Sequence, residues 1–429
     1  MSAGTPLRLF QGFGIELEYM VVDAASLSIA PIADQILHEV TGEYSDYESE
    51  KTAWSNELVL HVIELKTNGP APSLDPLPDL FLSDVRKINS ILRPRGARLM
   101  PGAMHPWMDP RVESHLWPHE YSLVYEAFDR IFDCSGHGWS NLQSMHINLP
   151  FGSDEEFGRL HAAIRILLPI LPALAASSPI VESRATGLLD NRLEFYRKNA
   201  RRVPAVAGNV IPEVASSRAE YEREILEKVY AGLAPFDPEG ILRHEWANAR
   251  GAIARFDRDA IEIRVLDVQE CAWADLAIAA AIVSALRAII DERWAPLARV
   301  RDWPGEPLAD LFLSTLRDAD AAAVDRSGAA VIRNSGYLAL FGMNRDRATA
   351  GELWAHLIQE TLFSSPDAAI WREPLETILT EGPLARRILA RLGVPPSTAQ
   401  AIPRERIAEV YGDLCDCLDQ GTLFHGARQ

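Results

Sequence analysis

Apolar and polar residues alternate in three short segments of the chain, and a period of two predicts β-strands with one buried face and one polar face. The segments are GIELEYMVV from Gly14, SMHINLP from Ser144 and IEIRVLDV from Ile261. The residues predicted for the apolar faces are Ile15, Leu17, Tyr19, Met145, Ile147, Leu149, Ile261, Ile263 and Val265. The opposite faces carry Glu16, Glu18, Ser144, His146, Asn148, Glu262 and Arg264, so reactive side chains are expected on one open side of a sheet.

A fourth alternating segment, ELVLHVIELKTN at 57–68, predicts a further strand. Glu64 is in phase with the leucines and the valine that precede it, which would bury its carboxylate. Glu57 lies seven residues earlier, and an odd step cannot place two side chains on one face of a regular strand. Either a bulge intervenes, or Glu57 lies at the mouth of the strand.

Amphipathic helices are predicted between these strands, because apolar residues recur there with helical spacing. The segments are roughly 75–93, 117–132, 154–176, 218–231 and 273–294. Strands and helices do not alternate strictly, which favours an α+β fold, with an antiparallel or mixed sheet and helices packed on one face. From about residue 300 the pattern is almost wholly helical. We expect a catalytic sheet-and-helix domain at 1–300, with a mainly helical region at 301–429 packed on it.

Composition narrows the possible partners. The chain has 429 residues, of which 48% are hydrophobic, and a formal net charge of -18. Such a charge argues against binding to nucleic acid or to an anionic membrane. The longest charge-free apolar run, at 276–286, is too short to span a bilayer, and the first residues lack the layout of a signal peptide. The apolar helix near 276–290 could pack in the core or against a second copy in a homo-oligomer.

The four cysteines are too scattered for a disulfide framework, which favours a reducing compartment, and we expect a cytoplasmic protein. Cys415 and Cys417 form a CDC pair that could bind a metal. However, no second Cys or His pair lies at the spacing of a zinc site, so two cysteines near a helical tail are the simpler interpretation.

Two glutamates on one strand face suggest a cation between them. Mg²⁺ prefers hard oxygen ligands and often bridges carboxylates to substrate phosphates, a role that suits Glu16 and Glu18. A solvated strand face would explain a single E-x-E motif better. Further candidate ligands on other predicted strands weaken that explanation, and they are Glu57, Glu64, His146 and Glu262. For Glu64 the alternative is an ion pair with Lys66.

The other polar residues also allow two interpretations. A single histidine on a strand is usually a satisfied polar residue, but Asn148 accompanies His146 on the same face. Glu262 and Arg264 could form a simple ion pair, or a metal ligand beside a guanidinium that binds phosphate. The chain lacks the P-loop, the dinucleotide fingerprint, H-E-x-x-H and G-x-S-x-G. If a nucleotide binds, metal and arginines must hold its phosphates.

These segments resemble the glutamate–cysteine ligase family 2 (GCS2) of carboxylate–amine ligases. The matching pieces are GIELEYMVVD (14–23), NELVLHVIELKTN (56–68), GAMHP (102–106), SMHINLP (144–150), SSPIVESRATGLLDNR (177–192) and ARFDRDAIEIRVLDVQ (254–269), with weaker matches at 333–344 and 381–389. They follow one another in the expected order over nearly the whole chain. The resemblance implies a catalytic fold similar to those of glutamine synthetase and the guanido kinases.

The resemblance also implies an activity. ATP with Mg²⁺, or Mn²⁺ in its place, would phosphorylate the carboxylate of glutamate or a similar acid, and an amine, by default cysteine, would then displace phosphate, as in glutathione biosynthesis. The metal ligands or their neighbours would be Glu16, Glu18, Glu57, Glu64, His146 and Glu262. His146 would also belong to the nucleotide site, where Arg264 and Arg255 would contact phosphate, and Glu64 and Arg264 would act in catalysis.

Other residues carried over by the resemblance have competing roles. Arg192 would bind the substrate carboxylate, with Arg184 and Arg197 as competitors, and His105 would line the pocket or hold a turn. The chain departs from the family pattern at Leu17, where a third glutamate is usual, and at Asn148, where a second histidine is usual. Two rival functions are a phosphotransferase of the guanido-kinase type and a non-catalytic module that binds nucleotide.

Overall fold

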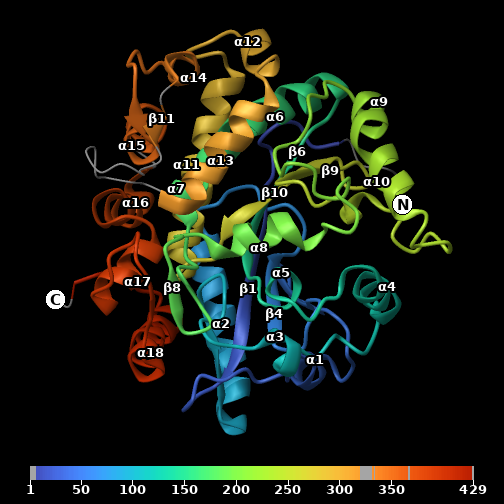
Figure 1. Ribbon diagram of the computed structural model, residues 1–429, viewed down its shortest axis with the longest axis vertical. Coiled ribbons are helices and arrows are strands. Elements are labelled where there is room, and N and C mark those ends of the chain that lie inside the picture. Colours follow the sequence, from blue (N-terminus) through green and yellow to red (C-terminus); the bar gives the residue numbers. More distant parts are fainter. Residues whose placement is uncertain (1–5, 319–330, 333, 366–367, 428–429) are drawn as a thin grey trace.

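An antiparallel sheet forms the centre of the computed structural model, which describes residues 6–318, 331–332, 334–365 and 368–427 (Figure 1). Its strand order is β2-β3-β4-β1-β6-β10-β9, and β5 pairs with the second half of β1. The strands are β1 (Gly14–Asp23), β2 (Tyr47–Glu48), β3 (Thr52–Asn56), β4 (Val62–Thr67), β5 (Ala97–Met100), β6 (Ser144–Pro150), β9 (Ala252–Arg255) and β10 (Ala260–Asp267). The prediction of an α+β fold with an antiparallel sheet is confirmed.

The strand register brings the predicted polar residues together. Glu16 on β1 lies opposite His146 on β6, and Glu18 lies opposite Glu64 on β4. Glu262 on β10 lies opposite Asn148. The β6–β10 pairing shifts register between Ile263 and Leu266, where a bulge lets β10 bend.

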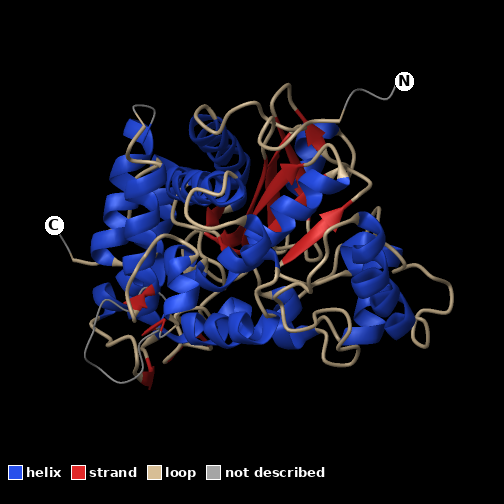
Figure 2. Cartoon of the chain, turned by 90° about the horizontal axis from the view of Figure 1, so that it is seen from above, coloured by secondary structure: helices blue, strands red, loops and turns tan. Residues whose placement is uncertain are grey.

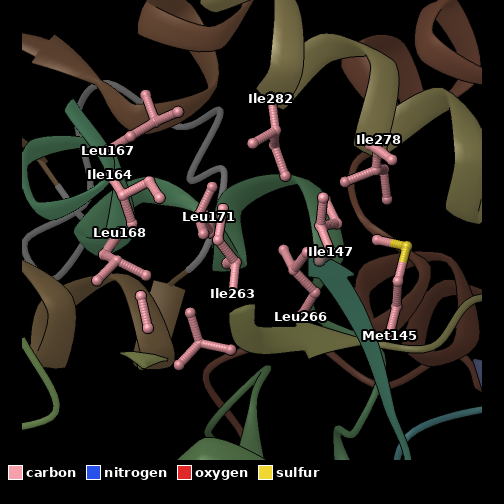
Figure 3. Close-up of a cluster of buried hydrophobic side chains, with 14 of the residues drawn as sticks. Met145, Ile147, Ile164, Leu167, Leu168, Leu171, Ile263, Leu266, Ile278 and Ile282 are labelled. Atoms are coloured by element: carbon pink, nitrogen blue, oxygen red, sulfur yellow. The ribbon is translucent and has the colours of Figure 1, made fainter. Parts of the chain in front are cut away.

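Helices cover the apolar face of the sheet. The main ones are α2 (Leu77–Leu92), α6 (Asp154–Leu167) and α11 (Ala272–Ile290). The short helices η2 (Leu168–Ile170) and α7 (Pro172–Ala175), which follow α6, belong to the same layer. Ile278 and Ile282 of α11 meet the strand residues Ile147, Ile263 and Leu266 in one buried cluster (Figure 3). All the residues predicted for the apolar faces are buried there, which confirms the phase of the three strands.

Helix α11 is apolar on nearly every side. It is the one helix, among the residues that the structure describes, that is long and apolar enough to cross a membrane by length and composition. Most of it is buried inside the protein, where it packs against α2, α6, α15 (Ala350–Thr361) and α16 (Ala369–Glu381). A core position accounts for this composition.

The C-terminal part is mainly helical in the residues described, and part of it lies along one flank of the molecule, away from α4 (Ser122–Phe132) (Figure 1). Its remaining helices are α12 (Leu297–Arg301), α13 (Gly305–Asp318), α14 (Ser335–Ala339), α17 (Leu384–Leu392) and α18 (Arg404–Gln420). It also contains β11 (Val331–Ile332), β12 (Ala348–Thr349) and β13 (Ala399–Ala401); β13 pairs with β8 (Arg184–Thr186), which pairs with β7 (Ile180–Val181). Helix α18 packs on α2 and β5. The predicted division at residue 300 stays a prediction.

A buried ion pair holds the chain after α18. The guanidinium of Arg387 on α17 binds both carboxylate oxygens of Glu270, which follows β10. It also donates to the carbonyl oxygen of Phe424, 2.5 Å away, and to that of Gly382, 3.2 Å away. Both charged side chains are fully buried, so each charge is compensated within the protein.

The remaining helices are short or surround the open side of the sheet (Figure 2). They are α1 (Ala33–Thr41), η1 (Arg93–Arg95), α3 (Pro110–Glu113), α5 (His137–Ser140), α8 (Asn191–Asn199), α9 (Arg218–Tyr221), η3 (Glu222–Leu226), α10 (Glu227–Leu233) and η4 (Glu245–Ala247). The helix predicted at 117–132 begins only at Ser122, and those predicted at 154–176 and 218–231 are each divided into shorter pieces.

The strand predicted at 57–68 is wrong in its first half. Only Val62–Thr67 belongs to the sheet as β4, and β3 has already ended at Asn56. Between them, Val59 forms a β-bridge with Leu116, outside the sheet. The backbone N–H of Leu60 donates to the carbonyl of His115, and the N–H of Trp117 donates to the carbonyl of Leu58. Glu57 therefore directly follows β3, a strand that was not predicted, and it lies neither in a bulge nor at the mouth of β4, which begins five residues later.

Candidate active site

A pocket of about 1040 Å³ opens on the polar face of the sheet. Strands β1, β4, β6 and β10 form its floor, and residues of α4 and η4 also line it. Its charged and imidazole lining includes Glu16, Glu57, Glu64, Lys66, His146, Arg255, Asp257, Glu262 and Arg264. Glu18 lies just below the lining and is 6% exposed. The strands thus bring the predicted acidic residues, His146 and the two predicted phosphate-binding arginines to one place.

Glu16 and His146 form the centre of the floor. Their side chains meet because the residues are direct partners across β1 and β6, and His146 Nδ1 lies 2.7 Å from Glu16 Oε2. The amide of Asn148 donates to the other oxygen of Glu16 at 2.9 Å. Burial acts to raise the pKa of Glu16, but the hydrogen bond and charge of His146 outweigh it and lower that pKa to about 2. Glu16 is therefore ionised at neutral pH.

His146 is enclosed by acceptors. Its Nε2 lies 2.9 Å from Ser144 Oγ, while Glu18 and Glu262 have oxygens 3.7 and 3.8 Å from its ring nitrogens. Burial opposes the charged form, but Glu16 and then the other carboxylates raise the pKa of His146 to about 9. In this arrangement the imidazolium is the cation that the acidic floor surrounds.

Glu18 and Glu64 are neighbours across β1 and β4. The backbone N–H and the hydroxyl of Ser144 donate to Glu18 at 2.7 and 2.9 Å. Glu64 accepts from Ser55 Oγ at 2.6 Å and lies 3.2 Å from Lys66 Nζ. Burial first, and then the charge of Glu16, raise the pKa of Glu64 to about 7. Glu64 thus has both the predicted Lys66 partner and acidic neighbours.

Glu262 is paired with two arginines. Residues two apart on a strand share a face, so Arg264 reaches Glu262 Oε1 through Nη2 at 2.6 Å and Nε at 2.9 Å. Arg255 on β9 donates to Oε2 of the same carboxylate at 3.4 Å. Burial would raise the pKa of Glu262, but Arg264 outweighs it and the pKa is lowered. Arg264 and Arg255 both line the pocket, as does Arg258.

The donor set fits a hard divalent cation. In the described part of the chain, two groups of side chains place ligand atoms within 4.8 Å of one another, namely Glu16, His146 and Glu262, and Glu18, Glu64 and His146. Four of these five residues offer carboxylate oxygens, which Mg²⁺ and Mn²⁺ both accept, and the imidazole suits Mn²⁺ better. A bound cation would compete with the proton on His146 for the same electron pairs.

Glu57 belongs to neither group of potential ligands. It lines the pocket after the end of β3, and the backbone N–H of Leu58 donates to its carboxylate at 3.3 Å. Burial, followed by the charges of Glu18 and Glu64, raises its pKa well above the ordinary value. The predicted metal role of Glu57 stays a prediction, since this carboxylate lies farther from the cluster.

The structure does not bring Arg192 to the pocket lining. Its side chain is buried on α8, and Nε donates to Asp267 at 2.5 Å, so the guanidinium is engaged within the protein and its predicted substrate-binding role has no support from its position. Arg184 on β8 and Arg197, which binds Glu194, are also outside the lining. His105 is fully buried, and its Nδ1 accepts from the N–H of Met108 at 3.0 Å, so it holds a turn.

The CDC pair is not part of a metal cluster. Cys415 of α18 is buried in an apolar cluster with residues of α17, and the described residues with metal-binding geometry include no cysteine. The interpretation of Cys415 and Cys417 as residues of a helical tail is the one that their positions favour.

Sequence reasoning missed the apolar side of the pocket. Tyr121, Val124, Tyr125 and Phe128, at α4, line the pocket together with Trp246 of η4. The signal was present, because positions 121, 124, 125 and 128 share one helix face, but such spacing usually indicates a face packed on the core.

Comparison with solved structures agrees with this fold. The glutamate–cysteine ligase of Francisella tularensis, in complex with AMP, superposes with a TM-score of 0.61 at 12% identity, covering 96% of this chain and 90% of that one. A bifunctional glutathione synthetase of Pasteurella multocida gives 0.55 at 14% identity, covering 95% of this chain and 53% of that one. At these identities the likeness establishes the fold alone.

The family is identified from the sequence. The model of glutamate-cysteine ligase family 2 (GCS2) matches residues 12–413, and the chain belongs to this family. An uncharacterized protein of Archaeoglobus fulgidus is 38% identical over 281 residues, which cover 65% of this chain and 75% of that protein. A protein of Bradyrhizobium sp. BTAi1, provisionally named glutamate–cysteine ligase 2, is 28% identical over 277 residues. That match covers 63% of this chain and 59% of the relative.

Proposed function

We propose that this protein is an ATP-dependent ligase that joins the γ-carboxylate of glutamate, or of a similar acid, to an amine. The observation that carries the proposal is the acidic floor, where four carboxylates and His146 meet at the base of one pocket with two arginines beside them. Membership of the GCS2 family supports the same reaction class.

The first half of the reaction transfers a phosphoryl group from ATP to the substrate carboxylate. Glu16, Glu18, Glu64, Glu262 and His146 would hold Mg²⁺, or Mn²⁺ in its place, and this metal would supply positive charge to the transferred phosphoryl group. Arg264 and Arg255 offer planar guanidinium donors that suit phosphate oxygens. They already lie in the lining, held by Glu262, so little reorganisation is needed to bind phosphate.

The second half forms the amide. The neutral amine attacks the acyl carbon, the new C–N bond replaces the bond from that carbon to the phosphate oxygen, and inorganic phosphate leaves with a proton from the amine. Because an acyl phosphate also reacts with water, the site must exclude solvent at this stage. The apolar residues of α4 that line the pocket are suited to that purpose.

Measurement of ADP release with glutamate and Mg²⁺, with the amine varied across all amino acids and simple amines, tests this proposal. The expected result is ADP and phosphate release that depends on both glutamate and an amine, with a γ-glutamyl amide identified by mass spectrometry. Phosphoryl transfer to an acceptor without phosphate release would instead indicate a phosphotransferase. Absence of ATP turnover with every acceptor would favour a non-catalytic nucleotide-binding module.

A further inference from the structure

One wall of the pocket is an apolar face of α4. Val124, Tyr125 and Phe128 line the pocket from one side of the helix, and Tyr121, which directly precedes it, lines the pocket too. The three helical side chains pack partly against the core and also border the cavity of about 1040 Å³. An apolar face beside a polar floor indicates that part of the ligand is itself apolar.

This wall continues beyond α4. The ring centroid of Phe128 lies 5.8 Å from that of Trp246 and 5.2 Å from that of Trp139. His244 stacks on Trp246 with centroids 5.2 Å apart. We define the aromatic wall as Tyr121, Val124, Tyr125, Phe128 and Trp246, which all line the cavity. Within it, Phe128 and Trp246 are held by ring contacts.

One end of the aromatic wall lies near the carboxylate of Glu57, as a hydrogen bond and the strand register show. The hydroxyl of Tyr125 accepts from the side-chain amide of Asn56 at 2.9 Å, and Glu57 follows Asn56 directly. Asn56 is level with Tyr19 on β1, because both lie opposite Ile63 of β4. Glu57 lines this end of the pocket, and Glu64, one residue along β4 from Ile63, lines it nearby.

Arg255 lies toward the other end. It lies opposite Ala260, and Ala260 lies opposite Pro150, two residues beyond the partner of Gly14. Arg255 is thus about seven strand residues from the level of Asn56, roughly 23 Å along the strands. The end with Asn56 and Glu57 therefore has no arginine among its lining residues in the described chain, whereas Arg255 and Arg258 line the other end together with Asp257 and Asp259.

The two ends suit different substrates of the proposed reaction. The phosphates of ATP are attracted to the arginines, whereas an amine approaches as an ammonium ion, which the carboxylates attract and the arginines repel. We propose that α4 forms the acceptor subsite and that the acceptor is an amine carrying an aromatic or large apolar group. This proposal rests on the ligase function proposed above. Cysteine, with one methylene and a thiol, would leave most of this wall exposed to water.

Bond formation is unchanged by this assignment. The acceptor nitrogen, after losing its ammonium proton to solvent, attacks the acyl phosphate, and phosphate leaves as described above. The aromatic wall contacts only the side group of the amine and takes no part in bond making. Its expected effect is on the selection of amines, since even one extra methylene in an apolar pocket can change kcat/KM by about 10-fold or more.

The test compares amines in the full-length protein with glutamate, ATP and Mg²⁺. We expect kcat/KM for 2-phenylethylamine to exceed the values for cysteine and for methylamine by at least about 10-fold. Phe128→Ala should reduce kcat/KM for 2-phenylethylamine at least about 10-fold more than it reduces kcat/KM for methylamine, with KM for ATP within about twofold of wild type. Leu123→Ala is the matched control on the same helix, because Leu123 is 69% exposed and does not line the pocket.

A preference for cysteine or methylamine would overturn the proposal. So would a Phe128→Ala variant that raises KM for ATP and leaves the amine preference intact, because the wall would then bind the adenine ring. Calorimetric titration of 2-phenylethylamine, with Mg²⁺ and a non-hydrolysable ATP analogue present, separates this proposal from the ligase reaction. Binding that weakens in Phe128→Ala supports the subsite even without turnover, whereas absence of binding contradicts it even if another amine is ligated.

Discussion

Two clusters of charged side chains lie below the surface of this protein, and they differ in charge balance. Arg387 and Glu270 are one cation and one anion, fully buried and joined by two hydrogen bonds. The pocket floor instead gathers Glu16, Glu18, Glu64 and Glu262 around one imidazolium, and Lys66 also pairs with Glu64 and Arg264 with Glu262. The first cluster is complete within the chain, whereas in the second Glu16 and Glu18 share one imidazolium as their ion-pair partner, an arrangement that suits a further cationic ligand.

The largest expected effect comes from breaking the buried ion pair of Arg387 and Glu270, which is called the balanced cluster below. Arg387→Met should lower the free energy of unfolding by about 3–5 kcal/mol, because Glu270 would be left buried without a cation. Denaturant titration measures this loss. Arg8→Met is the control, since Arg8 is mostly exposed in its pair with Glu156 and its loss should cost about 1 kcal/mol or less. Equal losses in the two variants would remove the distinction between buried and exposed pairs.

Replacement of an acidic residue of the floor should instead remove activity and keep the fold. Glu16→Gln should reduce turnover at least about 1,000-fold, equivalent to about 4 kcal/mol of transition-state free energy, because it removes a charged ligand at the centre of the cluster. Circular dichroism should be unchanged. Glu155→Gln, at an exposed position on α6, is the control that should retain full activity. Near-normal turnover of Glu16→Gln would contradict the role assigned to the floor.

A metal should stabilise the pocket floor and leave the balanced cluster unaffected. At 100 times its dissociation constant, Mg²⁺ should add about 2.7 kcal/mol to the free energy of unfolding, seen as a rise in Tm relative to the protein in EDTA. Glu262→Gln should lose most of this rise, because it removes one of the grouped ligands. An equal rise in wild type and variant would mean that the metal binds elsewhere.

The smallest effect concerns the ionisation of Glu64. Burial, and then the charge of Glu16, raise its pKa from 4.5 to about 7, so the folded protein binds the proton more tightly than the unfolded chain does. The stability that this proton contributes is fully present below pH 4.5 and is lost as the pH rises through about 7. Without metal, Glu64→Gln should therefore be more stable than wild type by about 1–2 kcal/mol at pH 8, and similar at pH 4.5. Thermal melts at the two pH values measure this difference, and an equal effect at both would exclude the ionisation of Glu64 as its cause.

Much of the fold follows from local pattern. The strands β1, β6 and β10 were predicted with the correct phase because each alternates strictly over one sheet face, and α2 and α11 because their apolar residues have helical spacing. The error at 57–61 has a physical reason. The leucines there alternate as in a strand, but the backbone bends at Leu58 and turns at 60–61, and Val59 bridges to Leu116 outside the sheet. Alternation of side chains does not show where the backbone turns away from the sheet.

The site residues that lie on strands could be predicted from the sequence. The contacts between segments far apart in the sequence could not. Glu16, His146 and Glu262 share a face by strand periodicity, so their meeting could be expected. The engagement of Arg192 by Asp267 joins residues 75 positions apart, and nothing in either neighbourhood indicates the pair. The exposure of the apolar face of α4 to a cavity likewise depends on where the connecting loops place the helix.

Helix α11 also bears on how the chain is made. During synthesis this apolar segment leaves the ribosome before α15 and α16, which cover it in the finished protein, have been translated. At usual elongation rates the delay is on the order of 5–20 s. Over that interval the nascent chain exposes an apolar segment to which chaperones can bind. A truncated protein that ends before α15 would leave this segment uncovered and would be prone to aggregate.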